Sequence, residues 1–522
     1  MGAARDAGEQ RPTGSRQPHI LDLVEPHLGG GAAAVADSTG AFSYRELDEA
    51  SGAVAGALLA RGARPDEPVV VHGTASRHTI AALLGVLRAG CCYVPVDASF
   101  PEDRQRLMAQ GSGARFVLVP EREGAGRPGK HPGPGEPAAS AQTPVPLAGL
   151  ERIDCGTRRG GAGPTRRGTH AYTCFTSGST GLPKAVTIAA TSLGWSTAAR
   201  LSHYAERVGA FLLCSSISFD SSMAGIWWTL ASGGLLVVPG ERPGDLLAVA
   251  RAAELHRATH LLMVPSLYGA ALRGGLAPRL RTLTTVIVAG ESCPPGLVAG
   301  HFAELPGVGL HNEYGPTECT VWATAHVCTP ADGDARTVPI GRPVPGVTLH
   351  IAEGELYIAG PGLAVPEEAA RTDADGRGND ADGREPGRFV TLHGIRHYRT
   401  GDLVTVREDG ELLFRGRADD QLKLGGLRLE RAEIERALTL CDGVTEAGVG
   451  VNGAAPRPRP IGFVVTEGTA FDERRARAQL LRSLPTTALP ARVIPVPALP
   501  HLPNGKVDYG MLDRRASAER RR

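Results

Sequence analysis

The sequence lacks the cysteine and histidine spacings that build metal sites. Its nine cysteines form no CxxC pair, and its sixteen histidines form no HExxH motif. Structural zinc sites and disulfide frameworks generally show such regular spacings. We therefore expect neither in this chain. A reducing cytoplasmic location is the expectation that follows.

The sequence also lacks an excess of charge and a long hydrophobic run. It has 56 basic and 55 acidic side chains, a formal charge of +1. No global field attracts nucleic acid or a membrane surface, so we expect neither as a partner. Residues 1–18 have no apolar core of the kind a signal peptide needs, and we expect a disordered leader there. We expect a solvated basic tail over residues 516–522, in the basic run from Arg514 to Arg522.

What the sequence does contain is an alternation of strands and helices. With 522 residues, 42% of them hydrophobic, the chain is long enough for two or more globular units. EPVVVHG predicts a strand, His78 to Leu87 a helix ending at Gly90, and CYVPVD a second strand. Similar strands recur at RFVLVP, LLVVP, HLLMVP and TVIVAGES. This pattern predicts an α/β fold with parallel sheets, interrupted by a Gly- and Pro-rich surface loop over residues 121–168.

The periodicity changes to two near residue 340. VTLHIAEGELYIAG and LVTVREDGELLFRG alternate apolar and polar residues around EG and DG turns, which predicts a small β-barrel-like subdomain over about 340–418. RAEIERAL, TEAGVGV, IGFVV and residues 472–484 then predict a separate α+β domain over residues 419–515. The predicted core therefore covers residues 19–418, followed by a smaller C-terminal domain.

The segment TCFTSGSTGLPKA has the composition of a phosphate-binding loop. Backbone N–H groups and hydroxyls in such a run can wrap a polyphosphate, and a lysine adds charge. The Walker spacing is absent, because Gly181 is followed by Leu182, Pro183 and Lys184. A plain Gly/Ser turn is the alternative interpretation. The predicted phosphate contacts are Thr176, Ser177, Gly178, Ser179, Thr180, Gly181 and Lys184.

TSGSTGLPK resembles the phosphate loop of the adenylate-forming superfamily, which includes nonribosomal peptide synthetase adenylation domains, acyl-CoA synthetases and luciferases. Further segments follow in the order of that family along nearly the whole chain. They are FSYREL from Phe42, LRAGCCYVPVD from Leu87, FDSS from Phe219, NEYGPTE from Asn312, GELYIAGPGLA from Gly354, YRTGDL from Tyr398, GRADDQLKLGGLRLE from Gly416 and NGKVD from Asn504. LRAGCCYVPVD and NGKVD are similar to peptide-synthetase adenylation domains in particular, so the chain resembles a stand-alone adenylation domain of that type.

The resemblance implies ATP and Mg²⁺ as cofactors and assigns residues to them. Glu318 would be the Mg²⁺ ligand, Thr317 a phosphate contact, Tyr314 the surface under adenine, and Asp402 the ribose-binding carboxylate. The same matching places Arg417, Gly290, Glu291 and Asn312 around the nucleotide.

The resemblance also implies two half-reactions that share one site. Lys506 matches the lysine that bridges the attacking carboxylate and the phosphate, so it would be catalytic together with Thr317 and Glu318. Asp419 matches the hinge between core and C-terminal domain. The chain continues only sixteen residues past Lys506. We therefore expect a peptidyl carrier protein to act in trans, and an MbtH-like protein is a candidate second partner.

The substrate pocket implied by the resemblance contains Asp220, which meets the α-ammonium group of an amino acid in this family. The remaining positions are Ser221, Ala224, Met263, Ile287, Ala289, Glu313, Val321 and Trp322. Small residues at several of them leave room for a ring. A buried acid without a partner is costly, so Glu313 predicts a ligand that offers a hydrogen-bond donor.

The predicted function is ATP-dependent activation of an amino acid, with L-histidine as the leading substrate because imidazole supplies such a donor. L-Tyrosine and L-tryptophan are alternatives that also pair a ring with one donor. An aryl- or acyl-CoA ligase is the rival enzyme, although it should not need Asp220. A catalytically inactive scaffold that binds a carrier protein is the rival without enzymatic activity.

Overall fold

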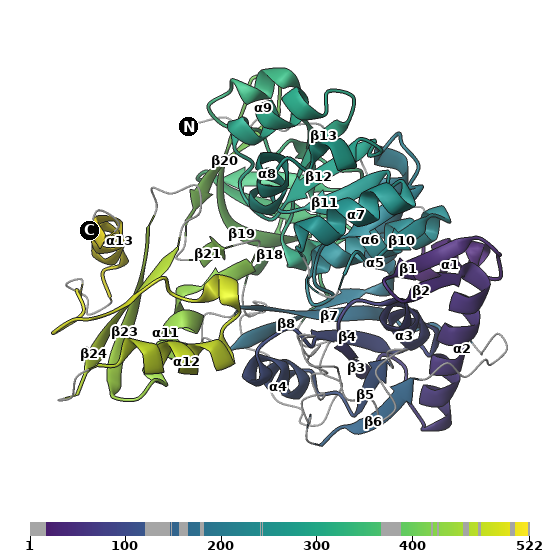
Figure 1. Ribbon diagram of the computed structural model, residues 1–522, viewed down its shortest axis with the longest axis horizontal. Coiled ribbons are helices and arrows are strands. Elements are labelled where there is room, and N and C mark those ends of the chain that lie inside the picture. Colours follow the sequence, from purple (N-terminus) through teal and green to yellow (C-terminus); the bar gives the residue numbers. More distant parts are fainter. Residues whose placement is uncertain are drawn as a thin grey trace, which may run out of the picture.

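The computed structural model describes residues 17–120, 147, 149–155, 165–177, 182–240, 242, 244–366, 388–418, 421–424, 427–452, 459–467, 471–501 and 507–519. Within them the chain forms α/β layers followed by a small C-terminal unit, which confirms the predicted fold class (Figure 1). Figure 1 shows α11, α12, β23, β24 and α13 gathered on one side of the molecule, at the left of the view. No helix in the described ranges has both the length and the apolar character that a membrane crossing requires.

The first layer is a six-stranded sheet of order β6-β5-β3-β4-β7-β8. Its strands are β3 (Pro68–Gly73), β4 (Cys92–Asp97), β5 (Phe116–Pro120), β6 (Glu151–Cys155), β7 (His170–Ser177) and β8 (Pro183–Ala189). The predicted strand–helix–strand unit is confirmed, because β3 and β4 pair in parallel. The helix between them, α3 (Arg77–Arg88), ends just before Gly90, whose φ of 74° is the left-handed conformation of a helix C-cap.

The prediction of a surface loop over residues 121–168 is wrong at Glu151–Cys155, which form strand β6. This strand pairs in parallel with β5, and Ile153 is buried. The sequence ERIDC has a single apolar residue flanked by charges, which is typical of an edge strand and gives a weak signal. Residues 121–146 of that predicted loop lie outside the described part of the chain.

The second layer is a nine-stranded sheet of order β15-β14-β13-β12-β11-β9-β10-β1-β2. Its strands are β1 (Ala33–Asp37), β2 (Gly40–Ser43), β9 (Ala210–Leu213), β10 (Leu235–Val237), β11 (His260–Met263), β12 (Thr285–Ala289), β13 (Gly309–Tyr314), β14 (Thr324–Val327) and β15 (Arg342–Pro343). The central strands β13, β12, β11, β9, β10 and β1 are all parallel. Their carboxyl ends therefore share one edge of the sheet.

Helices cover both large sheets and join them through one apolar core. They are α1 (Ile20–Val24), α2 (Tyr44–Ala60), α4 (Glu102–Gly111), α5 (Ala190–His203), α6 (Asp220–Ser232), α7 (Leu246–His256), α8 (Pro265–Arg273) and α9 (Pro295–Glu304). α2 begins with a capping box in which Ser43 and Glu46 each accept a hydrogen bond from the other's backbone N–H. Helices α5 and α6 contribute Leu193 and Trp227 to a core shared with β3, β4 and β7.

The predicted β subdomain is a five-stranded antiparallel sheet. It contains β16 (Thr348–Ala352), β17 (Glu355–Ala359), β18 (Phe389–Leu392), β19 (Ile395–Val406) and β20 (Leu412–Arg417). A hairpin of β21 (Gln421–Leu424) and β22 (Leu427–Glu430) follows. The C-terminal unit then packs α11 (Arg431–Thr439), α12 (Glu473–Ser483) and α13 (Tyr509–Glu519) on β23 (Val444–Val451), β24 (Pro460–Thr466) and β25 (Val493–Pro495).

The prediction of a solvated tail over residues 516–522 is wrong at residues 516–519, which belong to helix α13. Helix α13 continues to Glu519, and Ala516 is completely buried among Ile461, Phe463 and Leu512. Glu519 also forms an ion pair with Arg492. Leu512 and Ala516, four residues apart, give the helix a buried apolar stripe, which the count of basic residues conceals.

Candidate active site

The predicted nucleotide residues converge at the carboxyl ends of β12 and β13. Gly290 and Glu291 follow β12, while Thr317 and Glu318 lie in a 3-10 turn, Thr317–Cys319, just after β13. In open parallel sheets this edge is where ligands bind, since loops there are free of the hydrogen-bond ladder. The turn is half-buried at Thr317 and buried at Glu318. Residues distant in sequence are thus brought to one edge.

Tyr314, Asp402 and Arg417 form a buried polar triad across two sheets. The Tyr314 hydroxyl donates to Asp402 Oδ2 at 2.5 Å, and Arg417 Nη1 donates to Asp402 Oδ1 at 2.7 Å. Burial raises the pKa of Tyr314 well above its ordinary value, and the Asp402 carboxylate adds to the rise. The phenol therefore stays protonated and holds Asp402 in one orientation. Each carboxylate oxygen keeps lone-pair capacity for a further donor such as a sugar hydroxyl.

Asn312 and Glu291 have protein partners of their own. The Asn312 side chain donates to the carbonyl of Pro339 at 2.7 Å and is buried. The Glu291 carboxylate accepts from the backbone N–H of Ser266 at 2.9 Å, in the first turn of α8, and from its hydroxyl at 3.1 Å. Both contacts fix the loops around the predicted nucleotide site. A structural role is thus visible for both residues beside the predicted binding role.

Only part of the predicted phosphate loop lies in the described residues. Thr176 and Ser177 end β7, Lys184 is the second residue of β8, and Thr176 pairs with Lys184 across this antiparallel hairpin. Lys184 is exposed, whereas Ser177 is buried. Gly178, Ser179, Thr180 and Gly181 lie outside the described residues, as do Lys506 and the predicted hinge residue Asp419. Their roles stay predictions.

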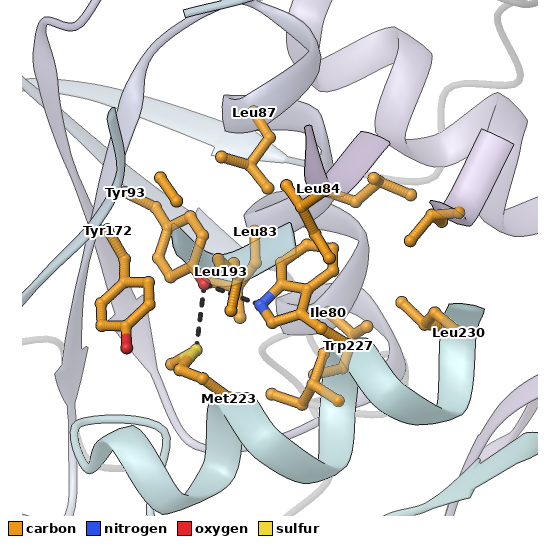
Figure 2. Packing of buried hydrophobic residues seen from close by; sticks show 14 of the residues in the cluster. Ile80, Leu83, Leu84, Leu87, Tyr93, Tyr172, Leu193, Met223, Trp227 and Leu230 are labelled. Atoms are coloured by element: carbon orange, nitrogen blue, oxygen red, sulfur yellow. Dashed lines mark hydrogen bonds between the residues drawn. The ribbon is translucent and has the colours of Figure 1, made fainter. Parts of the chain in front are cut away.

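Helix α6 carries the first three predicted substrate residues, Asp220, Ser221 and Ala224. Figure 2 shows how the helix is anchored: the Tyr93 hydroxyl donates to Met223 Sδ at 3.0 Å and accepts from Trp227 Nε1 at 2.9 Å. Tyr93 belongs to β4, so one buried hydroxyl ties α6 to the six-stranded sheet. This contact fixes the position of Asp220, which is half-buried at the first position of the helix.

Asp220 lies near β7, the strand that leads into the predicted phosphate loop. Burial raises the pKa of Tyr172 and of Cys174, both on β7, well above their ordinary values, and the negative charge of Asp220 raises both further. Ser221 donates to the hydroxyl of Ser215 at 3.0 Å. The start of α6 therefore faces the six-stranded sheet, as an amino-acid site next to the phosphate loop requires.

One face of the nine-stranded sheet unites three predicted substrate residues. Ala289 pairs with Glu313 and Ile287 with His311, so Ile287, Ala289 and Glu313 point to the same side. Met263 pairs with Val288 and is buried in the opposite core cluster, together with Val286 and Val288. Met263 therefore faces away from Ile287 and Ala289 in this structure, and its place in the pocket stays a prediction.

On β11, the residue that points to the same side of the sheet as Ile287 is Leu262. It pairs with Ile287 and belongs to the same core cluster as Ala224, Ile287 and Trp322. A shift of one residue in a strand exchanges the two faces of the sheet. The resemblance that assigned Met263 does not show the register of β11, and HLLM is apolar at three consecutive positions, so periodicity gives no register either.

Val321 is the central residue of a strained turn that runs from Thr320 to Trp322. The backbone N–H of Trp322 donates to the Thr320 carbonyl at 3.1 Å, and Val321 has φ of 77°, a combination typical of a γ-turn. A β-branched residue rarely adopts a positive φ, and such strain is concentrated at functional sites. The turn places the fully buried Trp322 ring beside helix α5.

Glu313 has protein partners, so the premise that it is an unpaired acid is wrong. Arg200 of α5 forms two hydrogen bonds with it, Nη1 to Oε1 at 2.6 Å and Nη2 to Oε2 at 2.9 Å. The Tyr204 hydroxyl donates to Oε1 as well. The side chains of Arg200 and Glu313 are 1% and 2% exposed. A substrate donor is therefore not needed to compensate Glu313.

Sequence reasoning missed Arg200 and Tyr204. They stand four residues apart, with Arg200 in the last turn of α5 and Tyr204 directly after the helix. That spacing was the available signal, yet nothing in the sequence links RLSHY to β13, over 100 residues later in the chain. The residues meet only because α5 crosses the face of the nine-stranded sheet.

Comparison with known proteins agrees with this architecture. Residues 27–365 match the AMP-binding enzyme family, and residues 433–506 match the AMP-binding enzyme C-terminal domain. The chain belongs to the AMP-binding enzymes. The members of this family are adenylate-forming ligases that use ATP with a divalent metal, typically Mg²⁺.

Relatives within the AMP-binding enzymes include parts of peptide synthetases. A plipastatin synthase polypeptide of Bacillus subtilis (strain 168) is 32% identical over 92% of this chain and 18% of its own length. The chain thus spans less than a fifth of that relative. Novobiocin biosynthesis protein H of Streptomyces niveus is 34% identical over 90% of this chain and 77% of its own length.

A solved structure has the same fold over almost the whole chain. It is a holo NRPS protein containing adenylation and PCP domains, bound to a vinylsulfonamide inhibitor. The two share a TM-score of 0.76 and 26% sequence identity, covering 96% of this chain and 84% of the other. The likeness extends over the core and the C-terminal unit.

Proposed function

We propose that this AMP-binding enzyme activates an α-amino acid with ATP and then transfers it to a carrier-protein thiol. A carboxylate oxygen attacks the α-phosphorus while the bond to the bridging oxygen breaks, which gives aminoacyl-AMP and pyrophosphate. The thiolate of a phosphopantetheine arm then attacks the acyl carbon and displaces AMP. The observation that carries the proposal is the Tyr314–Asp402–Arg417 triad beside the Thr317–Glu318 turn.

The residues of the chain supply binding and positioning in the first step. Asp402, held by Tyr314 and Arg417, accepts hydrogen bonds from the ribose hydroxyls. The Ser177 and Lys184 ends of the β7–β8 hairpin border the polyphosphate, and Lys506 balances the charge that builds up between carboxylate and phosphate. In-line displacement at phosphorus needs fixed geometry and charge compensation more than proton transfer. The residue types at this sheet edge suit that demand.

The donor set at Glu318 fits a Mg²⁺ ion. Mg²⁺ is usually held by one or two carboxylates together with substrate phosphates and water, and Glu318 supplies one buried carboxylate. When bound, the ion would neutralise phosphate charge. Thr317, in the same turn, would donate its hydroxyl to a phosphate oxygen.

The proposed substrate is an α-amino acid with an uncharged side chain. Asp220 is the proposed partner of the substrate's α-ammonium group. This carboxylate is half-buried at the start of α6, and its charge acts on Tyr172 of β7. L-Histidine stays the first substrate to test, now as a neutral imidazole, with L-tyrosine and L-tryptophan beside it. The revised pocket contains Asp220, Ser221, Ala224, Leu262, Ile287, Ala289, Glu313, Val321 and Trp322.

The proposed acceptor is a peptidyl carrier protein supplied in trans, in the cytoplasm where ATP is available. The matched structure contains adenylation and PCP domains in one protein, which supports a carrier as the partner. An MbtH-like protein is proposed as an optional second partner, on sequence resemblance alone.

ATP–pyrophosphate exchange with each proteinogenic amino acid, with and without an MbtH-like protein, tests the proposal. We expect exchange that depends on the amino acid. Glu318→Gln and Lys506→Ala should each lower it by about a hundredfold, the usual loss when one charge-stabilising group is removed. Exchange with aryl or fatty acids but with no amino acid would instead indicate an acyl-CoA ligase. No exchange with any acid would favour the inactive scaffold.

A further inference from the structure

A buried cluster surrounds Glu313 at the end of the proposed pocket. Arg200 and Tyr204 bind its carboxylate, and the Arg200 guanidinium lies 4.2 Å from the centroid of the Trp322 ring. Trp228 lies on another side, with its ring 5.9 Å from the same guanidinium. Two of these residues, Glu313 and Trp322, are pocket residues in the proposed function. Arg200 therefore contacts two residues of the proposed pocket.

The net charge of this cluster is zero. Arg200 contributes one positive and Glu313 one negative charge, in a bidentate geometry that favours the ionised pair. The other titratable groups that face Glu313 are Tyr204, His203 and His311. Burial raises the pKa of Tyr204 well above its ordinary value, and burial lowers the pKa of His203 and that of His311, the latter to about 4. All three are uncharged at neutral pH.

Donors without a partner outnumber acceptors without one in the cluster. The Nε1–H of Trp322 and the Nε–H of Arg200 are buried and have no hydrogen-bond partner among the described residues. Both oxygens of Glu313 are already accepting. Buried donors left without partners are costly, so a ligand that supplies an acceptor is favoured. This reverses the donor requirement expected from the sequence.

We propose that Arg200 is a specificity-determining residue which neutralises Glu313 and so excludes cationic side chains from the pocket. A lysine or ornithine side chain would have to lose its water shell against a wall of zero net charge. An uncharged side chain with an acceptor atom, such as neutral imidazole or a phenol oxygen, meets no such penalty. The inference rests on the proposed amino-acid adenylation and adds the class of side chain.

A double-mutant cycle on Arg200 and Glu313, made in the whole chain, tests the inference. Amino-acid-dependent pyrophosphate exchange is measured for the wild type, Arg200→Met, Glu313→Gln and the double variant. The panel contains histidine, tyrosine, phenylalanine, lysine and ornithine. We expect wild type to prefer histidine or tyrosine over the two cations. In Arg200→Met the ratio of kcat/KM for lysine to that for tyrosine should rise by about tenfold or more, because Glu313 is left unpaired.

The double variant separates specificity from folding. Removing both charges should restore the wild-type ranking of substrates, although its absolute rate can differ. Thermal unfolding shows whether Arg200→Met folds. If it does not, Arg200→Lys is used instead, and because it keeps the positive charge we expect it to retain the wild-type ranking of substrates. A ranking that is the same in all variants would overturn the role of Arg200, while adenylation itself would stand. A wild-type enzyme that prefers lysine or ornithine would also overturn the role of Arg200. If no amino acid supported exchange in the wild type, the proposed function itself would be contradicted.

Discussion

At the scale of residues, the nucleotide site depends on side chains that hold one another. Asp402 is fixed by Tyr314 from the nine-stranded sheet and by Arg417 from β20, so its orientation is set before any ligand binds. Preorganisation of this kind spares the ligand the cost of ordering the site. The hydroxyl of Tyr314 is therefore expected to matter for ATP binding although its ring alone could support adenine.

Tyr314→Phe removes that hydroxyl and keeps the ring. A hydrogen bond to a charged group contributes roughly 1.5 kcal/mol, so we expect KM for ATP to rise by about tenfold. Initial-rate pyrophosphate exchange at varied ATP measures it. Tyr357→Phe, on β17, is the matched control and should leave KM unchanged. An unchanged KM in Tyr314→Phe would show that Asp402 is oriented without the phenol.

His260 should make the fold sensitive to acid. Burial lowers its pKa from 6.5 to about 4, and its ring packs edge-on against Trp228 with centroids 5.0 Å apart. Between these pH values the unfolded chain binds a proton that the folded chain does not, so stability is lost as pH falls from 6.5 toward 4. At pH 5 the loss from this one group is about 2 kcal/mol.

Thermal unfolding of wild type and His260→Gln at pH 7 and pH 5 checks this prediction. The wild-type midpoint should fall more than that of the variant over the same interval. His393→Gln, at an exposed turn between β18 and β19, provides the control and should follow the wild type. Equal falls in wild type and His260→Gln would contradict a neutral buried imidazole.

At the scale of elements, helix α6 links the hydrophobic core to the substrate site. Met223 and Trp227 bind the Tyr93 hydroxyl on the buried side of the helix (Figure 2). Asp220, at the first position of the helix, and Ser221 are only half-buried. A change in the core is therefore transmitted to the position of Asp220.

Tyr93→Phe leaves the buried Nε1–H of Trp227 without an acceptor. The expected cost is about 1 to 3 kcal/mol, seen as a lower thermal midpoint. We also expect KM for the amino acid to rise while KM for ATP stays near its wild-type value, since the hydrogen bonds that hold the nucleotide triad join β13, β19 and β20. A rise in both constants would indicate general loosening of the core instead.

The sequence predicted elements far better than it predicted side-chain partners. β3, α3, β4, β12 and the hairpin β16–β17 all follow from local periodicity and turn residues, which act within a few positions. β6 was missed because it has only one apolar residue. Met263 was assigned by resemblance to the family, and a local match of letters does not show which face of a strand a side chain occupies.

The pairing of Glu313 could not be predicted, since its partner lies on a distant helix. A lone buried acid in a sequence gives no sign of whether the fold supplies an arginine. The ATP-site residues were predicted through their motifs, and the structure places Tyr314, Asp402 and Arg417 together as those motifs imply.

At the scale of the whole molecule, a buried ion pair connects the core to the C-terminal unit. Arg104 of α4 binds Glu433 of α11, and their side chains are 5% and 7% exposed. Phe219, just before α6, packs against the C-terminal core cluster that contains Ile434 and Leu480. These contacts fix how the C-terminal unit sits against the six-stranded sheet in this structure.

Glu433→Gln leaves Arg104 charged and buried without its partner, which costs about 3 to 5 kcal/mol when a buried pair is broken. We expect faster amide hydrogen exchange in α4 and α11 than in the wild type. The double variant Arg104→Met, Glu433→Leu removes both charges and should exchange more slowly than the single variant. Equal exchange in all three proteins would mean that the pair does not hold the two units together.

The central claim is that this chain joins an amino acid to AMP. Incubating the protein with ATP, Mg²⁺, each amino acid and hydroxylamine traps an activated carboxylate as its hydroxamate, and the nucleotide product is measured in the same sample. We predict hydroxamate formed from an uncharged amino acid, with AMP and pyrophosphate in equal amounts. Formation of ADP and inorganic phosphate, or AMP release that is independent of any amino acid, would contradict the claim.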